Sequence, residues 1–202
     1  MKTRKTLALA TLALAAAASL TLPLAAQAQQ GPWQVRVRAL NLDPANKDGT
    51  GLNLSVNSKT FPEVDFSYYF SPQLSAELIL TYPQKHTVKA GNTEIGSIKH
   101  LPPTLTAQYH FTDLGSFVPY VGAGINYTRF SSVNLPPGVT IKNSSVGAAL
   151  QAGVDVPIDK TMTFNFDVKK VQIATNVTAA GVERGKFKVD PLLVGIGLGW
   201  RF

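Results

Sequence analysis

The chain has 202 residues, of which 19 are basic and 12 acidic, and its formal net charge is +7. It contains no cysteine, which excludes a disulfide framework and a thiolate zinc site. Hydrophobic residues make up 45% of the chain, too many for a disordered protein. Only 15% of the residues are charged, whereas about 25% is usual for a soluble domain.

The first segment has the three-part layout of a secretory signal peptide. Three basic residues lie within the first five positions, and residues 6–24 are almost wholly apolar. Ala26-Gln27-Ala28 then supplies a small-residue cleavage pattern, which together with Pro23 favours cleavage over a membrane anchor. Residues 1–28 are therefore predicted to be removed, which leaves residues 29–202 with a net charge of +4. This small surplus gives little reason to expect a nucleic-acid partner.

In the mature chain, apolar and polar residues alternate with a period of two, which predicts β-strands. Eight segments of about ten residues alternate between an apolar face and a polar, small or charged face. They are residues 33–40, 63–70, 74–82, 103–111, 120–128, 147–155, 162–169 and 194–202.

The connections between these segments alternate in length. The short turns are residues 71–73, 112–116 and 158–161. The long polar connections are residues 43–60, 84–100, 131–144 and 174–187. This alternation predicts an all-β, eight-stranded antiparallel transmembrane β-barrel with short periplasmic turns and longer external loops, in a Gram-negative outer membrane. A soluble β-sandwich or lipocalin-like barrel also alternates, but it would bury its apolar face.

Aromatic residues gather at the strand ends of the apolar face, as in the girdles of membrane barrels. Tyr82 and Tyr127 lie near the predicted external ends. The periplasmic band comprises Trp33, Phe70, Phe111, Phe117, Phe164, Trp200 and Phe202. The terminal Phe202 resembles the signal read by the bacterial outer-membrane insertion machinery. We expect that machinery and the lipid bilayer as partners, and a monomeric barrel.

Four stretches of the mature chain resemble the OmpW family of outer-membrane proteins. They are HLPPTLTAQYHF at residues 100–111, PYVGAGINYT at 119–128, QAGVD at 151–155, and residues 190–202, which begin Asp-Pro and end Gly-Trp-Arg-Phe. Leu192 and Trp200 depart from the family pattern, which often has Trp and Tyr there. The resemblance implies an eight-stranded barrel, without enzymatic activity, that passes small hydrophobic molecules through the outer membrane.

The inward phase of the predicted strands is rich in charges. An eight-stranded barrel is just wide enough for side chains to fill it, so these charges are expected to pair. They are Arg36, Arg38, Lys169 and Arg201 against Glu63, Asp65, Glu77, Asp155 and Asp167. We predict a packed polar plug in the periplasmic half of the lumen.

Two inward residues, Leu40 and Ile79, are apolar among polar neighbours. The family resemblance implies an apolar constriction at Ile79, whereas Lys169 stands where an aromatic partner would complete a hydrophobic gate. The predicted constriction and plug residues are therefore Leu40, Ile79, Lys169, Arg36, Arg38, Glu77, Asp155 and Asp167.

Four prolines lie near the external ends of the second, third and fourth predicted strands: Pro62, Pro83, Pro102 and Pro103. Proline has no N–H to donate to a β-ladder, so the cluster predicts a lateral opening in the wall. An apolar solute would enter from outside, meet the plug and leave sideways into lipid. The alternative is that these prolines only end the strands.

No catalytic, cofactor-binding or metal site is predicted. His86 and His100 lie beside the second long connection, where a weak metal site is possible but solvated side chains are the commoner outcome. His110 points inward and is expected to hydrogen-bond within the plug. Two other functions stay open: a structural or adhesion barrel, including a receptor for phage or colicins, and a narrow ion channel.

Overall fold

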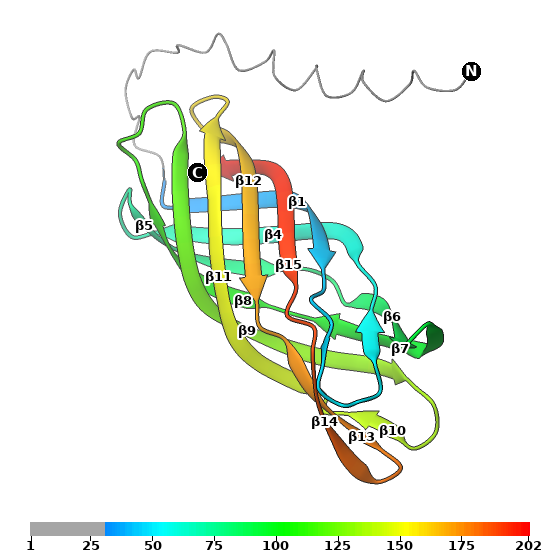
Figure 1. Cartoon of the computed structure of the whole chain (residues 1–202). Helices are drawn as coiled ribbons and strands as arrows, with labels where there is room; N and C mark the ends of the chain where they lie inside the picture. Colours follow the sequence, from blue (N-terminus) through cyan, green and yellow to red (C-terminus); the bar gives the residue numbers. More distant parts are fainter. Residues whose placement is uncertain (1–30) are drawn as a thin grey trace, which may run out of the picture.

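The computed structural model describes residues 31–202, so the predicted signal peptide lies outside the described residues. Eight strands close into an antiparallel barrel in which β15 pairs back with β1 (Figure 1). In wall order they are β1 (Trp33–Asp43), β4 (Lys59–Tyr69), β5 (Leu74–Leu80), β8 (Thr104–His110), β9 (Val118–Asn134), β11 (Ser144–Pro157), β12 (Met162–Val171) and β15 (Leu192–Arg201). The predicted fold class is confirmed.

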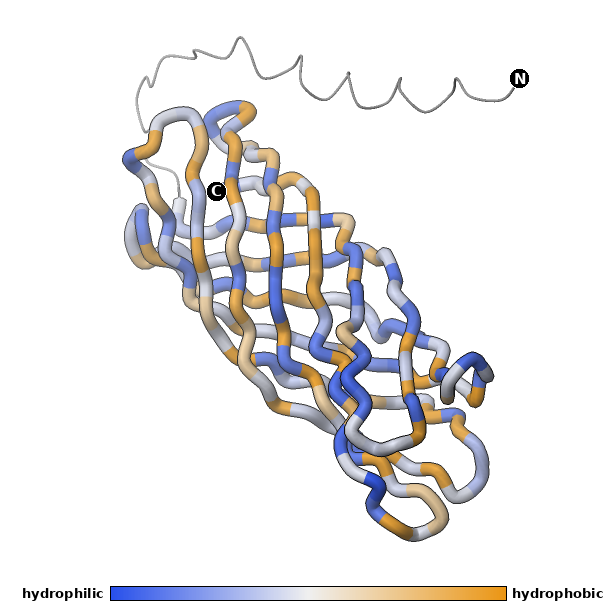
Figure 2. The backbone as a smooth tube through the Cα atoms, in the orientation of Figure 1, coloured by the Kyte–Doolittle hydropathy of each residue, from blue (hydrophilic) through white to orange (hydrophobic). Residues whose placement is uncertain are grey.

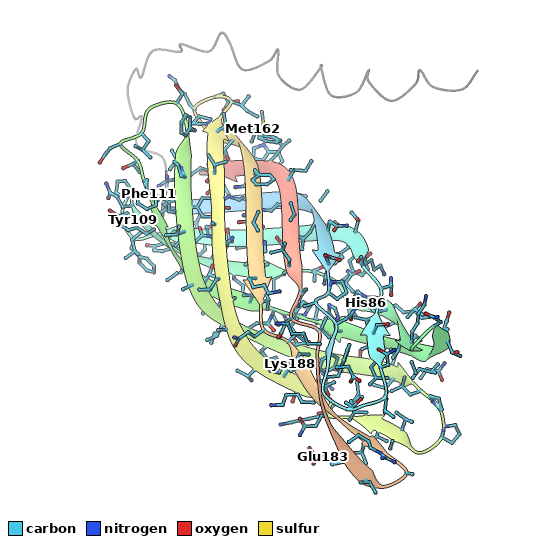
Figure 3. The ribbon with its side chains drawn as sticks, viewed as in Figure 1. His86, Tyr109, Phe111, Met162, Glu183 and Lys188 are labelled. Atoms are coloured by element: carbon cyan, nitrogen blue, oxygen red, sulfur yellow. The ribbon has the colours of Figure 1, made fainter. Side chains whose placement is uncertain are left out.

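The two faces of the wall are polar inside and apolar outside. On β8, Thr106 and Gln108 are buried, whereas their neighbours Leu105 and Tyr109 are about half exposed. Figure 2 shows hydrophobic and hydrophilic positions alternating along the wall strands, and Figure 3 shows Tyr109 and Phe111 pointing away from the barrel. An exposed apolar face is the pattern of a wall that faces lipid. Within residues 31–202, no helix is long and apolar enough to cross a membrane.

The start and the end of the described chain meet at one end of the barrel. The Trp33 N–H donates to the Phe202 carbonyl at 3.2 Å, and the Phe202 N–H donates to the Trp33 carbonyl at 2.9 Å. The short turns lie at this same end, which is therefore the periplasmic end. The long connections all lie at the opposite, external end (Figure 1).

The four long connections lie at the external end as predicted, but they are not loops throughout, because parts of them form strands that extend the barrel outward. A hairpin of β6 (Gln84–Ala90) and β7 (Thr93–Leu101) joins β9 through β7, and β3 (Leu54–Val56) pairs with β6. A second sheet has the order β10 (Val139–Ile141), β13 (Ala174–Ala179), β14 (Val182–Lys188) and β2 (Lys47–Asp48).

The inward positions of these extra strands explain why the sequence pattern was missed. On β6 the buried residues are Gln84, His86 and Val88, two polar and one apolar. A strand whose buried face mixes polar and apolar residues has no clear hydrophobic period. Such a segment therefore resembles a polar loop.

Candidate functional site

The periplasmic half of the lumen is closed by ion pairs that cross it. Arg36 on β1 is fully buried and lies 2.6 Å from Glu77 on β5 and 2.6 Å from Asp155 on β11. Its Nη1 also donates to the Ser67 hydroxyl on β4 at 3.0 Å. One guanidinium thus joins four strands of the wall, because its five fixed N–H groups reach several acceptors at once.

A second group of charges lies around Arg38. Its guanidinium is 2.7 Å from Asp65 and 3.1 Å from Glu63. Lys169 on β12 approaches the same Glu63 carboxylate at 2.6 Å and Asp167 at 2.9 Å. Burying charges is costly unless each is paired, and here each basic group contacts two or more carboxylates.

Neutral groups connect these charges into one network. The Gln151 amide donates to Glu77 at 2.9 Å and to Asp167 at 2.8 Å, and the Tyr120 hydroxyl donates to Asp167 at 2.6 Å. A Cβ at position 153 would collide with the Tyr120 ring and hydroxyl, so Gly153 leaves the space that Tyr120 occupies. We call this ion-paired, hydrogen-bonded region the polar plug.

Two predicted plug members are held differently. Arg201 lies with its guanidinium 3.8 Å from the Tyr69 ring centroid and donates to the Gly31 carbonyl at 3.1 Å, instead of pairing with an acid. The His110 ring bonds to the Ser75 hydroxyl at 2.9 Å. Both residues lie at the periplasmic side of the plug and help to fill it.

Above the plug, the lumen becomes apolar. A cavity of about 20 Å³ has Glu63 and Lys169 in its lining, where the plug begins. Its apolar lining consists of Leu40, Leu42, Phe61, Ile79, Val171, Ile173 and Leu193, with Pro102 and Pro191. A cavity of this volume holds about one water molecule, so its lining side chains are packed close together in this conformation.

A second apolar cavity lies inside the external extension. It is lined by Leu54, Val56, Val88, Ile95, Ile98, Leu135, Val139, Ile141, Val177 and Phe187, with Thr175. Many of these side chains belong to one buried hydrophobic cluster with Leu40 and Leu42. We call the two cavities and their lining the apolar chamber.

The structure places the predicted site residues on both sides of the boundary between the polar plug and the apolar chamber. Leu40 and Ile79 are 1% and 4% exposed and belong to the lining of the apolar chamber. The charged members lie in the polar plug, and Lys169 is ion-paired there. Sequence reasoning missed the upper chamber because its residues come from segments interpreted as loops. The alternation of Leu54 and Val56 was a signal, but it spans only three residues.

The four predicted wall prolines lie where strand pairing stops. The β4–β5 register ends at Val64 opposite Leu80, and the β5–β8 register ends at Ile79 opposite Thr104. Beyond Val64, the Pro62 carbonyl accepts a hydrogen bond from the Thr81 hydroxyl at 3.0 Å instead of from a backbone N–H.

Side chains also make the next contacts along this edge. The Lys59 ammonium donates to the Lys85 carbonyl at 3.2 Å. On the other side of β8, towards β9, pairing continues, because the Tyr127 N–H donates to the Pro103 carbonyl at 3.0 Å and the Asn126 amide donates to the Pro102 carbonyl at 3.1 Å. Pro83 is exposed at the end of β5, and Pro102 lines the lower cavity. We call the edge where β4, β5 and β8 lose their ladder the proline seam.

The prediction that His86 and His100 are solvated is wrong. Both are 1% exposed, and their rings stack with centroids 4.6 Å apart and planes 13° apart. His86 Nδ1 donates to the Asn57 carbonyl at 2.9 Å, whereas the Nε2 atoms of both rings have no hydrogen-bond partner. Burial lowers the pKa of His100 to about 3 and also lowers that of His86. Among residues 31–202, no group of three or more potential ligands is placed to hold a metal.

A closed barrel with an apolar outer belt and its long connections at one end is an outer-membrane barrel protein. The OmpW family model matches residues 29–202, and the chain belongs to the OmpW family. The predicted location in the outer membrane of Gram-negative bacteria is thereby confirmed.

Known proteins are similar to this chain along most of its length. An uncharacterized outer-membrane protein, y4mB of Sinorhizobium fredii, is 44% identical over 85% of this chain and 80% of its own length. The dibenzothiophene metabolism operon protein PahQ of Pseudomonas aeruginosa is 28% identical over 87% of this chain and 90% of its own. The crystal structure of OprG from Pseudomonas aeruginosa superposes with a TM-score of 0.71 and 29% identity, covering 86% of this chain and 97% of OprG.

Proposed function

We propose that this barrel passively passes small hydrophobic molecules from the outside into the outer membrane. The observation that carries the proposal is the division of the lumen into an apolar chamber outside and a polar plug below it. An apolar solute that moves the lining side chains apart and leaves water for the chamber gains free energy, since burial of apolar surface is worth about 25 cal/mol per Å². The plug offers the same solute no such gain.

The route through the plug is unfavourable for two reasons. The plug is filled by side chains, and a solute could pass only by separating buried partners such as Arg36 and Glu77. Breaking a buried ion pair leaves uncompensated charges and costs about 3–5 kcal/mol. The same closure gives no support to the alternative of a narrow ion channel.

The proline seam supplies a sideways exit. Its strands are joined by side-chain hydrogen bonds where the rest of the wall has a continuous ladder. Such an edge opens at a lower cost, because fewer backbone hydrogen bonds are lost. Pro102 belongs both to this edge and to the cavity lining, so opening there would connect the chamber with lipid.

The relatives agree with this substrate class. PahQ is named for an operon of dibenzothiophene metabolism, and dibenzothiophene is a small hydrophobic aromatic compound. The adhesion alternative stays a prediction, and deletion of the β13–β14 hairpin separates it from transport: binding would vanish while solute uptake persisted.

The direct test is uptake by cells with and without this protein. Cells that contain it are expected to take up naphthalene faster, with no change for a polar solute of similar size. Ile79→Asn places an amide in the chamber and should slow naphthalene uptake, whereas Val182→Asn on the exposed hairpin should not. Equal uptake with and without the protein would contradict the proposal.

A further inference from the structure

The charge of the protein is distributed unevenly along the barrel axis. The external end carries eleven basic side chains and five acidic ones. The basic residues are Lys47, Lys59, Lys85, Lys89, Lys99, Arg129, Lys142, Lys170, Arg184, Lys186 and Lys188. The acidic residues are Asp43, Asp48, Glu94, Glu183 and Asp190. The periplasmic end is balanced, with Lys160 and Arg201 against Asp113 and Asp159, so the external end holds a surplus of six positive charges.

Five exposed basic residues share one outward surface of the extension, which we call the basic face: Lys47, Arg129, Lys142, Lys186 and Lys188. Strand register brings the β14 members together with their neighbours. Lys188 lies directly opposite Lys47 on β2. Lys186 lies opposite Asn176, and the Asn176 carbonyl accepts the Lys142 N–H at 3.0 Å.

Arg129 continues the same face on the neighbouring strands. It lies opposite Ser144 on β11, and the adjacent Ser145 hydroxyl accepts the Ala174 N–H at 3.1 Å. Ala174 is in turn the partner of Lys188. The path from Arg129 to Lys188 therefore crosses β9, β11, β13 and β14, of which β9–β11 and β13–β14 are paired strands about 4.8 Å apart.

The charges of the basic face are not neutralised within the described protein. All ion pairs found among residues 31–202 lie in the lumen. Nearby Glu183 accepts a hydrogen bond from the Asn176 amide at 2.9 Å, and the Asp48 carboxylate accepts the Thr50 hydroxyl at 2.7 Å. Like charges directly opposite each other on a sheet are destabilising, so the face favours an anion from outside.

The basic face begins where the membrane ends. Tyr127, which is 51% exposed, precedes Arg129 by two residues on the same outward phase of β9. Tyrosine marks the headgroup level of membrane proteins, so Arg129 stands just beyond that level. Figure 3 places Lys188 near the barrel and Glu183 near the tip of the β13–β14 hairpin.

We propose that the basic face binds the phosphorylated saccharide headgroups of glycolipids in the outer leaflet. Ammonium and guanidinium groups form charge-assisted hydrogen bonds with phosphate oxygens. Free phosphate has the same chemistry, but a lipid phosphate is held at this height by its acyl chains and therefore has a high effective concentration. The glycolipid would also neutralise the opposed Lys47 and Lys188.

The test uses the purified barrel in phosphatidylcholine nanodiscs that contain diphosphorylated or dephosphorylated lipid A, with retained lipid counted by native mass spectrometry. We expect the diphosphorylated form to be retained about tenfold better. Lys47→Gln with Lys188→Gln should remove most of that preference, and Lys47→Arg with Lys188→Arg should keep it. Lys85→Gln with Lys89→Gln, which removes the same charge from the β6–β7 hairpin, should also keep it.

Several results would overturn the proposal. If the Lys47/Lys188 and Lys85/Lys89 double Gln variants lost the preference for diphosphorylated lipid A equally, only the total charge would matter. Equal retention of both lipid A forms by the wild-type barrel would exclude phosphate recognition. Displacement of lipid A by inorganic phosphate, but not by sodium chloride of equal ionic strength, would assign the site to free phosphate. Circular dichroism and the heat-dependent shift in gel mobility verify that each variant is folded.

Discussion

Lys169 lies 2.6 Å from Glu63 at the level where the polar plug meets the apolar chamber, and both residues line the lower cavity. Lys169 occupies the position where an aromatic gate residue was expected. Its ammonium forms ion pairs with Glu63 and Asp167. The charge is therefore part of the plug, and the lining of the cavity above it stays mainly apolar.

This pairing predicts a large stability effect. Lys169→Met leaves Glu63 with Arg38 alone and removes the cation beside Asp167, so unfolding in lipid vesicles should become about 3 kcal/mol easier. The double variant Lys169→Met with Glu63→Gln should lose less than the sum of the two single variants, because the partners are removed together. A Lys169→Met barrel with wild-type stability in urea titration would contradict the account of the plug.

The closed plug predicts a low ion conductance. In planar bilayers the wild-type barrel should show no steady open-channel current. Arg36→Ala removes the cation that joins Glu77 and Asp155, and these unpaired carboxylates should draw in water and cations. We expect small cation-selective currents from that variant only. Steady currents from the wild-type barrel would favour the ion-channel function instead.

The stacked histidines predict a dependence on pH in the external extension. The folded-state pKa of His100 is about 3, far below the ordinary value of 6.5, because the ring is buried beside His86 and near Lys59. A depressed histidine pKa means that the unfolded state binds the proton more readily. The contribution of neutral His100 to stability is therefore fully present above about pH 6.5 and is lost as the pH falls toward 3.

At pH 5 the loss from His100 should be about 2 kcal/mol. Hydrogen exchange of the β6–β7 amides should accelerate accordingly. His100→Phe keeps a stacked ring without the titration and should flatten the response, leaving only the smaller contribution of His86. An NMR titration in which the folded His100 gains its proton near pH 6 would refute this prediction.

The prolines of the seam predict a transport defect without loss of the barrel. Pro102→Thr with Pro103→Thr gives this edge two further N–H donors for pairing and should slow the uptake of small apolar solutes. Assembly is followed by heat-modified gel mobility, so a folding defect is recognised separately. Unchanged uptake with normal assembly would argue that these prolines merely end the strands.

The sequence predicted the wall and much of the plug, because both follow one strict rule. In the membrane, outward residues must be apolar and inward charges must pair, so each wall strand keeps a clear period of two. Above the plug the rule no longer applies. Leu40 and Leu42 face inward yet are apolar, and inward His86 on β6 is polar although it is buried. The hydrophobic period therefore fades where the chamber forms.

In the proposed route, solutes leave through the proline seam, and a reversible cross-link across the seam is the most direct test of that exit. Continuing the β4–β5 register beyond Val64 and Leu80 brings position 62 opposite position 82, and the natural chain has no cysteine to interfere. Pro62→Cys with Tyr82→Cys should transport naphthalene when reduced, lose transport when oxidised, and regain it with reductant. Val64→Cys with Leu80→Cys closes a ladder that is already paired, so its oxidation should change nothing. Undiminished uptake by the fully oxidised 62–82 barrel would contradict lateral exit.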